Sequence, residues 1–178
     1  LDAALQAGGT GGIAPAILAE ANAAFGGVSG NLRFLRAWPE FDAEYRDTQA
    51  VSASLTSVML GGDLRLSGSF SLEDSNLLRD AGLPSADRTV TGSLHASGRV
   101  PRWDSQPTLY VRLSSRRDLL PGPDYDWFET LVHFSWFQEL AGADLSVLSM
   151  VDWNLDRLGG LSYTSLTDEV AVSWKLGS

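Results

Sequence analysis

From Val28 to the end of the chain, apolar and polar residues alternate with a period of two, and this pattern constrains the fold more than any other feature. Successive side chains of a β-strand point to opposite faces, so the alternation predicts strands with one apolar and one polar face. Residues 64–72 are the clearest case, because leucine and phenylalanine occupy even positions while serine and arginine occupy odd ones. We expect eight strands, at residues 28–38, 48–59, 62–72, 89–100, 106–116, 127–138, 142–154 and 161–176.

The connections between these strands alternate in length. Gly61-Gly62 predicts a tight hairpin, and residues 101–105 and 139–141 are also short connections. Longer connections, rich in Asp, Pro and Gly, fall between them at residues 39–47, 73–88 and 117–126. Short and long connections therefore lie at opposite ends of the strands. This layout predicts an up-and-down antiparallel meander, and closure into a barrel would leave no sheet edge unpaired.

Residues 1–27 are rich in glycine and alanine and precede the expected barrel domain of residues 28–178. Pro15 to Phe25 contains five alanines, begins with proline and is followed by two glycines, which favours a short helix. The alternative is a strand with Ile17 and several alanines on one face. That alternative would raise the count to nine strands and make the chain the C-terminal piece of a larger barrel.

Composition excludes several classes of function. The chain has no cysteine and only two histidines, which argues against disulfides, thiolate metal sites and zinc enzymes. Its net charge of −9 and its scattered arginines argue against nucleic-acid binding. No run of 18 apolar residues is present, so a transmembrane helix is not expected.

Alternation does not say which face meets water, but three features favour lipid on the apolar side. Four tryptophans lie on the apolar parity near strand ends, as in the aromatic belts of membrane interfaces. The polar parity is dominated by serine and threonine, and the chain has a single lysine, unlike ordinary soluble surfaces. Strands of ten to twelve residues are long enough to cross the hydrocarbon at a tilt. The expected belt residues are Trp38, Trp136, Trp153 and Trp174.

Residues 28–176, with eight expected strands, short turns on one side and longer loops on the other, resemble the bacterial outer-membrane β-barrel superfamily. The resemblance is one of pattern, and no single motif carries it. It implies short turns in the periplasm, longer loops outside the cell, both termini in the periplasm, and membrane lipids and the barrel-assembly machinery as partners. One departure is the C-terminus, because family members usually end on an aromatic residue, whereas this chain continues past Trp174 to Ser178.

Charged residues on the polar parity would line the lumen of such a barrel. Arginines come from the earlier strands and carboxylates mainly from the later ones, so the two signs would lie on different walls. In a wide barrel this field would select solutes, whereas in an eight-stranded barrel the groups would pair, with Arg116 and Glu129 as the expected pair. The expected lumen charges are Arg33, Arg65, Arg99, Arg112, Arg116, Glu129, Asp144 and Asp152.

His133 and Ser135 lie two residues apart on one face of an expected strand. A histidine can activate a hydroxyl if a carboxylate orients it, and this spacing is similar to that of outer-membrane lipid A deacylases. The surrounding residues lack the asparagine-rich context of that family. Serine and threonine are so frequent on the polar parity that a chance His-x-Ser is expected.

We therefore expect a non-enzymatic outer-membrane barrel without metal or cofactor. It would act as a membrane anchor, a narrow pore, or the C-terminal part of a larger barrel such as an export or lipopolysaccharide-assembly pore. Two alternatives remain: a soluble eight-stranded barrel that binds a small apolar ligand, and an outer-membrane lipid hydrolase that uses His133 and Ser135. The acidic segments 40–47 and 118–126 are expected to be solvated loops.

Overall fold

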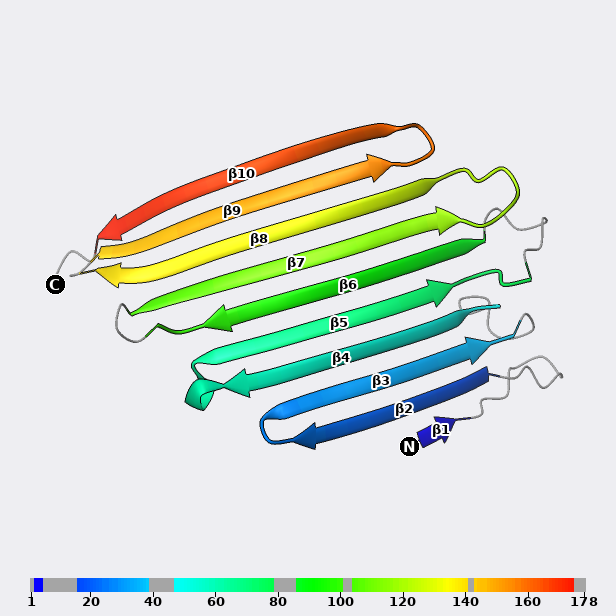
Figure 1. Ribbon diagram of the computed structural model, residues 1–178, viewed down its shortest axis with the longest axis horizontal. Coiled ribbons are helices and arrows are strands. Elements are labelled where there is room, and N and C mark those ends of the chain that lie inside the picture. The colour runs from blue at the N-terminus through cyan, green and yellow to red at the C-terminus, as the bar shows by residue number, and fades with distance from the viewer. Residues whose placement is uncertain are drawn as a thin grey trace.

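The computed structural model describes residues 2–4, 16–38, 47–78, 86–100, 104–140 and 143–174, which form one antiparallel sheet (Figure 1). The strands lie side by side in the order in which they occur in the chain, so the fold is the predicted all-β meander. Their bounds are β1 (Asp2–Ala4), β2 (Ala16–Phe25), β3 (Val28–Ala37), β4 (Gln49–Met59), β5 (Leu64–Asp74), β6 (Asp87–Gly98), β7 (Ser105–Asp118), β8 (Asp126–Leu140), β9 (Ala143–Asp156) and β10 (Leu161–Trp174), with a 3-10 turn, η1 (Leu60–Gly62), before β5. Within these described residues, no helix has the length and apolarity needed to cross a membrane.

The eight predicted strands correspond to β3 through β10, with ends that differ by a few residues. The alternation identified them correctly because each strand has one face of each polarity. The differences are at most two residues and occur at both ends of the sheet. At the end with the long connections, β5, β6, β7 and β9 each extend two residues further than expected. There the pattern of apolar residues fades, but the backbone ladder continues, as between Asp74 and Arg88.

The predicted helix at residues 15–25 is wrong, because residues 16–25 form strand β2. The two glycines that resembled the end of a helix form the turn of a β2–β3 hairpin, with φ of 57° at Gly26 and 82° at Gly27. Positive φ at both central residues gives a turn whose twist matches that of the flanking strands. Across this hairpin Glu20 lies opposite Arg33, and ten ladder positions outweigh the helix propensity of alanine.

The predicted closure into a barrel is not seen in the described residues. β1 pairs only with β2, and β10 pairs only with β9, so the sheet is open and has two edges. β2 and β10 run in the same direction, and they cannot form the antiparallel pair that a meander barrel requires. β1 runs the other way but contains three residues, against fourteen in β10.

The two ends of the sheet differ in the length of their connections, as predicted (Figure 1). At the short-connection end, on the left of Figure 1, lie the turns between β2 and β3, β4 and β5, β6 and β7, and β8 and β9. At the opposite, long-connection end, residues 38–48, 75–86 and 119–125 separate β3 from β4, β5 from β6, and β7 from β8 in the sequence. The connection between β9 and β10, residues 157–160, also lies there but has only four residues.

Register keeps each parity on one face across all nine long strands. The apolar face carries odd-numbered residues of β2, β4, β7 and β9 and even-numbered residues of the other long strands; the polar face carries the rest. One row of the apolar face, for instance, places Leu66, Ala96 and Leu109 on adjacent strands. A slip of one residue anywhere would move side chains to the wrong face, so the pattern determines the register.

The sheet has no second layer among the described residues, and its large apolar side chains are therefore exposed or only partly buried. The buried apolar residues are four alanines at strand ends or beside them: Ala16, Ala37, Ala86 and Ala143. By contrast, Leu32, Leu55 and Leu94 on the apolar face are 51%, 57% and 52% exposed. A single sheet in water would lose the burial that usually drives folding, so something must cover this face.

Candidate functional site on the polar face

A hollow of about 580 Å³ lies in the middle of the polar face. Histidine and tyrosine form its floor across three adjacent strands, since register places Tyr110 of β7 between His95 of β6 and His133 of β8. The rings of His95 and Tyr110 meet edge to face, with centroids 6.4 Å apart. Hydroxyls complete the lining, from Ser54, Thr56, Ser67, Ser69, Ser93 and Thr108.

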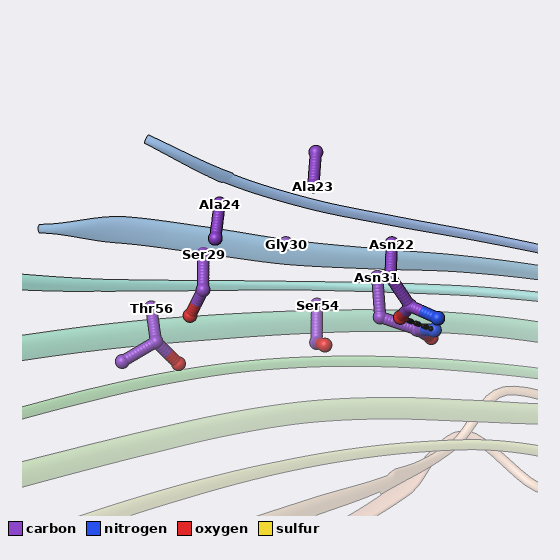
Figure 2. Close-up of a pocket in the computed structure, with 8 residues that line it drawn as sticks. All are labelled: Asn22, Ala23, Ala24, Ser29, Gly30, Asn31, Ser54 and Thr56. Carbon is purple, nitrogen blue, oxygen red and sulfur yellow. Dashed lines mark hydrogen bonds between the residues drawn. The ribbon is translucent and has the colours of Figure 1, made fainter. Parts of the chain in front are cut away.

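A second hollow, of about 440 Å³, lies on the same face over β2, β3 and β4 (Figure 2). In Figure 2 the side chains of Ser29, Asn31 and Ser54 point to one side of the sheet, while Ala23 points to the other. The Asn31 Nδ2 amide donates a hydrogen bond of 2.7 Å to Asn22 Oδ1 and so ties β3 to β2. The two hollows share Ser54 and Thr56, so hydrogen-bonding side chains line this face from β2 to β8.

The arginines of the polar face pair with carboxylates on neighbouring strands. Arg33 of β3 lies 3.2 Å from Glu20 of β2, and both side chains are about half exposed. Arg99, just after β6, pairs with Asp104 at 3.1 Å. Exposed pairs of this kind stabilise a fold little, by about 0–1 kcal/mol, so they neutralise charge on the face more than they hold the sheet.

The predicted pair of Arg116 and Glu129 is wrong, because Glu129 accepts a hydrogen bond from Arg112. Glu129 lies opposite Ser114, so both arginines stand one diagonal position away and either could reach it. Arg116 has other neighbours: Asp87 lies 3.4 Å away, and the Tyr125 ring lies 5.0 Å beneath its guanidinium.

The remaining predicted lumen charges also lie on the polar face. Arg65 of β5 forms no ion pair with any described residue, and Asp152 of β9 accepts a hydrogen bond of 2.8 Å from Asn154. Asp144 lies opposite Glu139 at the short-connection end. Because four of the expected lumen arginines have carboxylates beside them, the two signs of charge are less separated than expected, and the acidic excess lies on β9 and β10.

The four expected belt tryptophans lie near the ends of their strands. Trp136 and Trp174 lie toward the short-connection end, whereas Trp153 and Trp38 lie at the long-connection end. Trp153 packs edge to face on Phe128, with ring centroids 5.7 Å apart. The Arg36 guanidinium stacks over Trp38 at 5.2 Å.

The alternative catalytic residues, His133 and Ser135, share the polar face, but no hydrogen bond joins them. The Nε2 atom of His133 is buried and has no hydrogen-bond partner among the described residues. Glu129, one of the carboxylates that could orient the imidazole, is held by Arg112. The described residues also contain no group of three or more histidines and carboxylates that could hold a metal ion.

A row of buried aspartates at the long-connection end was missed by the sequence analysis. Asp47, Asp74, Asp118 and Asp126 are each less than a tenth exposed, although all but Asp74 fall in the segments 40–47 and 118–126 that were expected to be solvated. Asp74 accepts two hydrogen bonds from Arg88, at 2.7 and 3.0 Å. No local signal identifies these residues, because loop aspartates are usually exposed.

These aspartates form hydrogen bonds between neighbouring strands and connections at the long-connection end of the sheet. Asp47 accepts hydrogen bonds from the backbone N–H of Leu78, at 2.7 Å, and from Arg36, at 3.2 Å. Asp118, the last residue of β7, accepts from the backbone N–H groups of Leu120 and Ala86. These N–H donors stabilise the ionised carboxylate of Asp118.

A double-mutant cycle tests the corrected ion pair. Removing the side chains of Arg112 and Glu129 to alanine, singly and together, is expected to give a coupling energy of about 1 kcal/mol, because both groups are partly buried. The measurement is chemical unfolding followed by tryptophan fluorescence. The same cycle on Arg116 and Glu129 serves as the control and is expected to show no coupling. A larger coupling in the control would mean that Glu129 pairs with Arg116 after all.

A scan against protein-family models found no match for this chain, and neither the curated proteins nor the solved structures that were compared include a match.

Proposed function

We propose that the chain forms part of the wall of a transmembrane β-barrel in a bacterial outer membrane, with its apolar face toward lipid and its polar face toward the lumen. The observation that carries this proposal is the exposed apolar face, which extends over nine long strands and is covered by no layer of described residues. Lipid tails would cover such a face without any second layer. In this role the protein is a membrane anchor, a narrow pore or part of a larger transport or assembly barrel.

Strand length and the placement of charge support this proposal. The nine long strands contain 10 to 15 residues, and about 9–11 residues suffice to cross the hydrocarbon at a tilt. With one exception, the charged residues of the apolar face lie within two residues of the long-connection end, where headgroups and water would solvate them. They are Arg36, Asp74, Arg88, Arg117 and Asp126.

The polar face suits a lumen. Both hollows lie on it, and their linings of hydroxyls and amides can bind water or polar solutes. The hollows do not support the soluble alternative, because a barrel around an apolar ligand needs its hollow on the apolar side. The hydrolase alternative is not supported by a contact between His133 and Ser135.

Lipid-dependent quenching of a fluorophore tests the proposal. Since the chain has no cysteine, Leu94→Cys and Ser93→Cys place single labels on adjacent residues of β6 that belong to opposite faces. In vesicles that contain lipids brominated on their tails, we expect strong quenching at residue 94 and weak quenching at residue 93. Aqueous iodide should give the reverse order.

Circular dichroism of both labelled variants controls for folding, since each should show the same β-sheet signal. Equal lipid quenching at the two positions, together with a native β signal, would contradict the proposal. A monomeric, β-rich chain in buffer without detergent or lipid would also contradict it, and would favour the soluble alternative.

A further inference from the structure

The outer edge of β10 is suited to hydrogen bonding with another strand. None of its fourteen residues is paired on that side by a described residue, and all fourteen are exposed. Natural exposed edges are usually protected by lysine, proline or a bulge, but residues 161–174 contain no lysine or proline, and their register with β9 is unbroken. In hydrocarbon every backbone N–H and C=O needs a partner, so such an edge must be covered.

Strand direction restricts what can cover this edge. β10 runs from the long-connection end to the short-connection end. Antiparallel pairing, which all neighbouring strands of this sheet use, requires a partner that runs the opposite way. β2 has the wrong direction, and β1 has the right direction but spans only three residues.

Asp168 makes a positively charged side chain favourable in a strand that pairs with this edge. It lies near the middle of β10 on the apolar face, between Leu166 and Val170, and is the only charged residue of that face in the described strands that lies far from the long-connection end. No described residue forms an ion pair with it. An ionised carboxylate at mid-membrane depth is costly unless it is paired, so a cation is expected beside it.

The surroundings of Asp168 differ from the rest of the apolar face. Ser149 lies directly opposite on β9, and Ser162 and Thr164 occupy the same face of β10. On the polar face of these last strands, by contrast, Leu148 and Met150 replace the serines of earlier strands. The apolar face of the β9–β10 hairpin thus carries hydroxyl groups opposite Asp168 and along β10 from it.

We propose that the free edge of β10 receives an antiparallel transmembrane strand that carries a lysine or arginine facing Asp168. This inference rests on the proposed function, because the cost of an unpaired Asp168 arises in lipid. The incoming strand belongs to polypeptide outside the described residues. A second copy fits poorly: pairing β10 with its own copy would bring two Asp168 carboxylates to one edge and put the long connections on opposite sides of the membrane.

Disulfide capture of synthetic strands tests the proposal in detergent. The chain carries Val170→Cys as its only cysteine. Two peptides of alternating polarity carry a central lysine, with a cysteine two residues before the lysine in one and two residues after it in the other. If the lysine lies opposite Asp168, only the first peptide places its cysteine opposite residue 170 in antiparallel register. We expect the first peptide to be captured at least about tenfold faster.

Charge is tested with a peptide in which glutamate replaces the lysine. Capture of the lysine peptide should fall about tenfold in the Asp168→Asn variant, and Asp168→Lys should prefer the glutamate peptide. As a matched control, Val111→Cys lies on the apolar face of β7, which has strands on both sides, and it should capture neither peptide.

Three results would overturn the proposal: faster capture of the second peptide, equal capture of lysine and glutamate peptides, or disulfide dimers of the Val170→Cys chain that outcompete peptide capture. The two proposals fail separately. Lipid quenching at residue 94 without charge-dependent capture would contradict only the proposal that β10 pairs with a strand carrying a cation. Charge-dependent capture without lipid quenching at residue 94 would contradict the proposed membrane barrel but would still show that the edge of β10 pairs with an added strand.

Discussion

Replacing Leu94 with arginine is expected to lower the free energy of unfolding in a lipid bilayer by about 2–4 kcal/mol, the cost of a basic side chain near the bilayer midplane. Leu94 lies on the apolar face of β6, away from both strand ends, and is half exposed, so the guanidinium would enter the hydrocarbon. Urea unfolding of the chain in lipid vesicles, followed by tryptophan fluorescence, measures this loss.

The neighbouring substitution Ser93→Arg is the matched control, because it adds the same side chain one residue away on the polar face. Its expected effect is smaller, about 1 kcal/mol, because it removes the hydrogen bond between the Ser93 and Ser69 hydroxyls and places a second guanidinium opposite Arg112. If both variants lost the same stability, the two faces would not differ in their surroundings. A larger loss for Ser93→Arg would mean that the polar face is the more tightly packed one.

Replacing Asp47 with alanine is expected to lower the free energy of unfolding by about 2–3 kcal/mol. The buried Asp47 carboxylate accepts from the backbone N–H of Leu78 and from Arg36, and its loss leaves both donors without that partner. Asp47 also has a φ of 50°, which alanine adopts less readily. Chemical unfolding in detergent, compared with the unmodified chain, checks the prediction.

Two further variants separate these contributions. Asp47→Asn keeps an acceptor for Leu78 and tolerates positive φ, so it should lose only the ion pair with Arg36, about 1 kcal/mol. Asp124→Ala removes an exposed carboxylate from the connection between β7 and β8 and should change stability little. An Asp47→Ala variant as stable as Asp124→Ala would show that the loop ends are not held by the buried carboxylate.

Sequence periodicity predicted β3 to β10 because each of these strands has faces of different polarity, which is a local property. The periodicity did not identify strand β2, because alanine has a strong helix propensity and the two faces of this alanine-rich strand differ little in polarity. Only its ladder with β3, including the contact of Glu20 with Arg33, shows that it is a strand. Here a pairing with a neighbouring strand outweighed a local preference.

The candidate site was predicted in part for the same reason. Parity placed Arg112, Arg116 and Glu129 on one face, and the structure keeps them there. Which arginine reaches Glu129 could not be predicted, because it depends on Asp87 and Tyr125 occupying the other one. Likewise, the burial of Asp47 and Asp118 depends on N–H donors from a connection distant in the sequence.

The amino-acid sequence is sufficient to predict a meander of amphipathic strands with connections of unequal length at its two ends, because alternation and turn residues act locally. The number of strands, the choice of ion pairs, the burial of the aspartate row and the open edge at β10 become visible only in the three-dimensional structure of the described residues. Those features depend on which strands become neighbours and in which direction they run, and no window of the sequence contains that information.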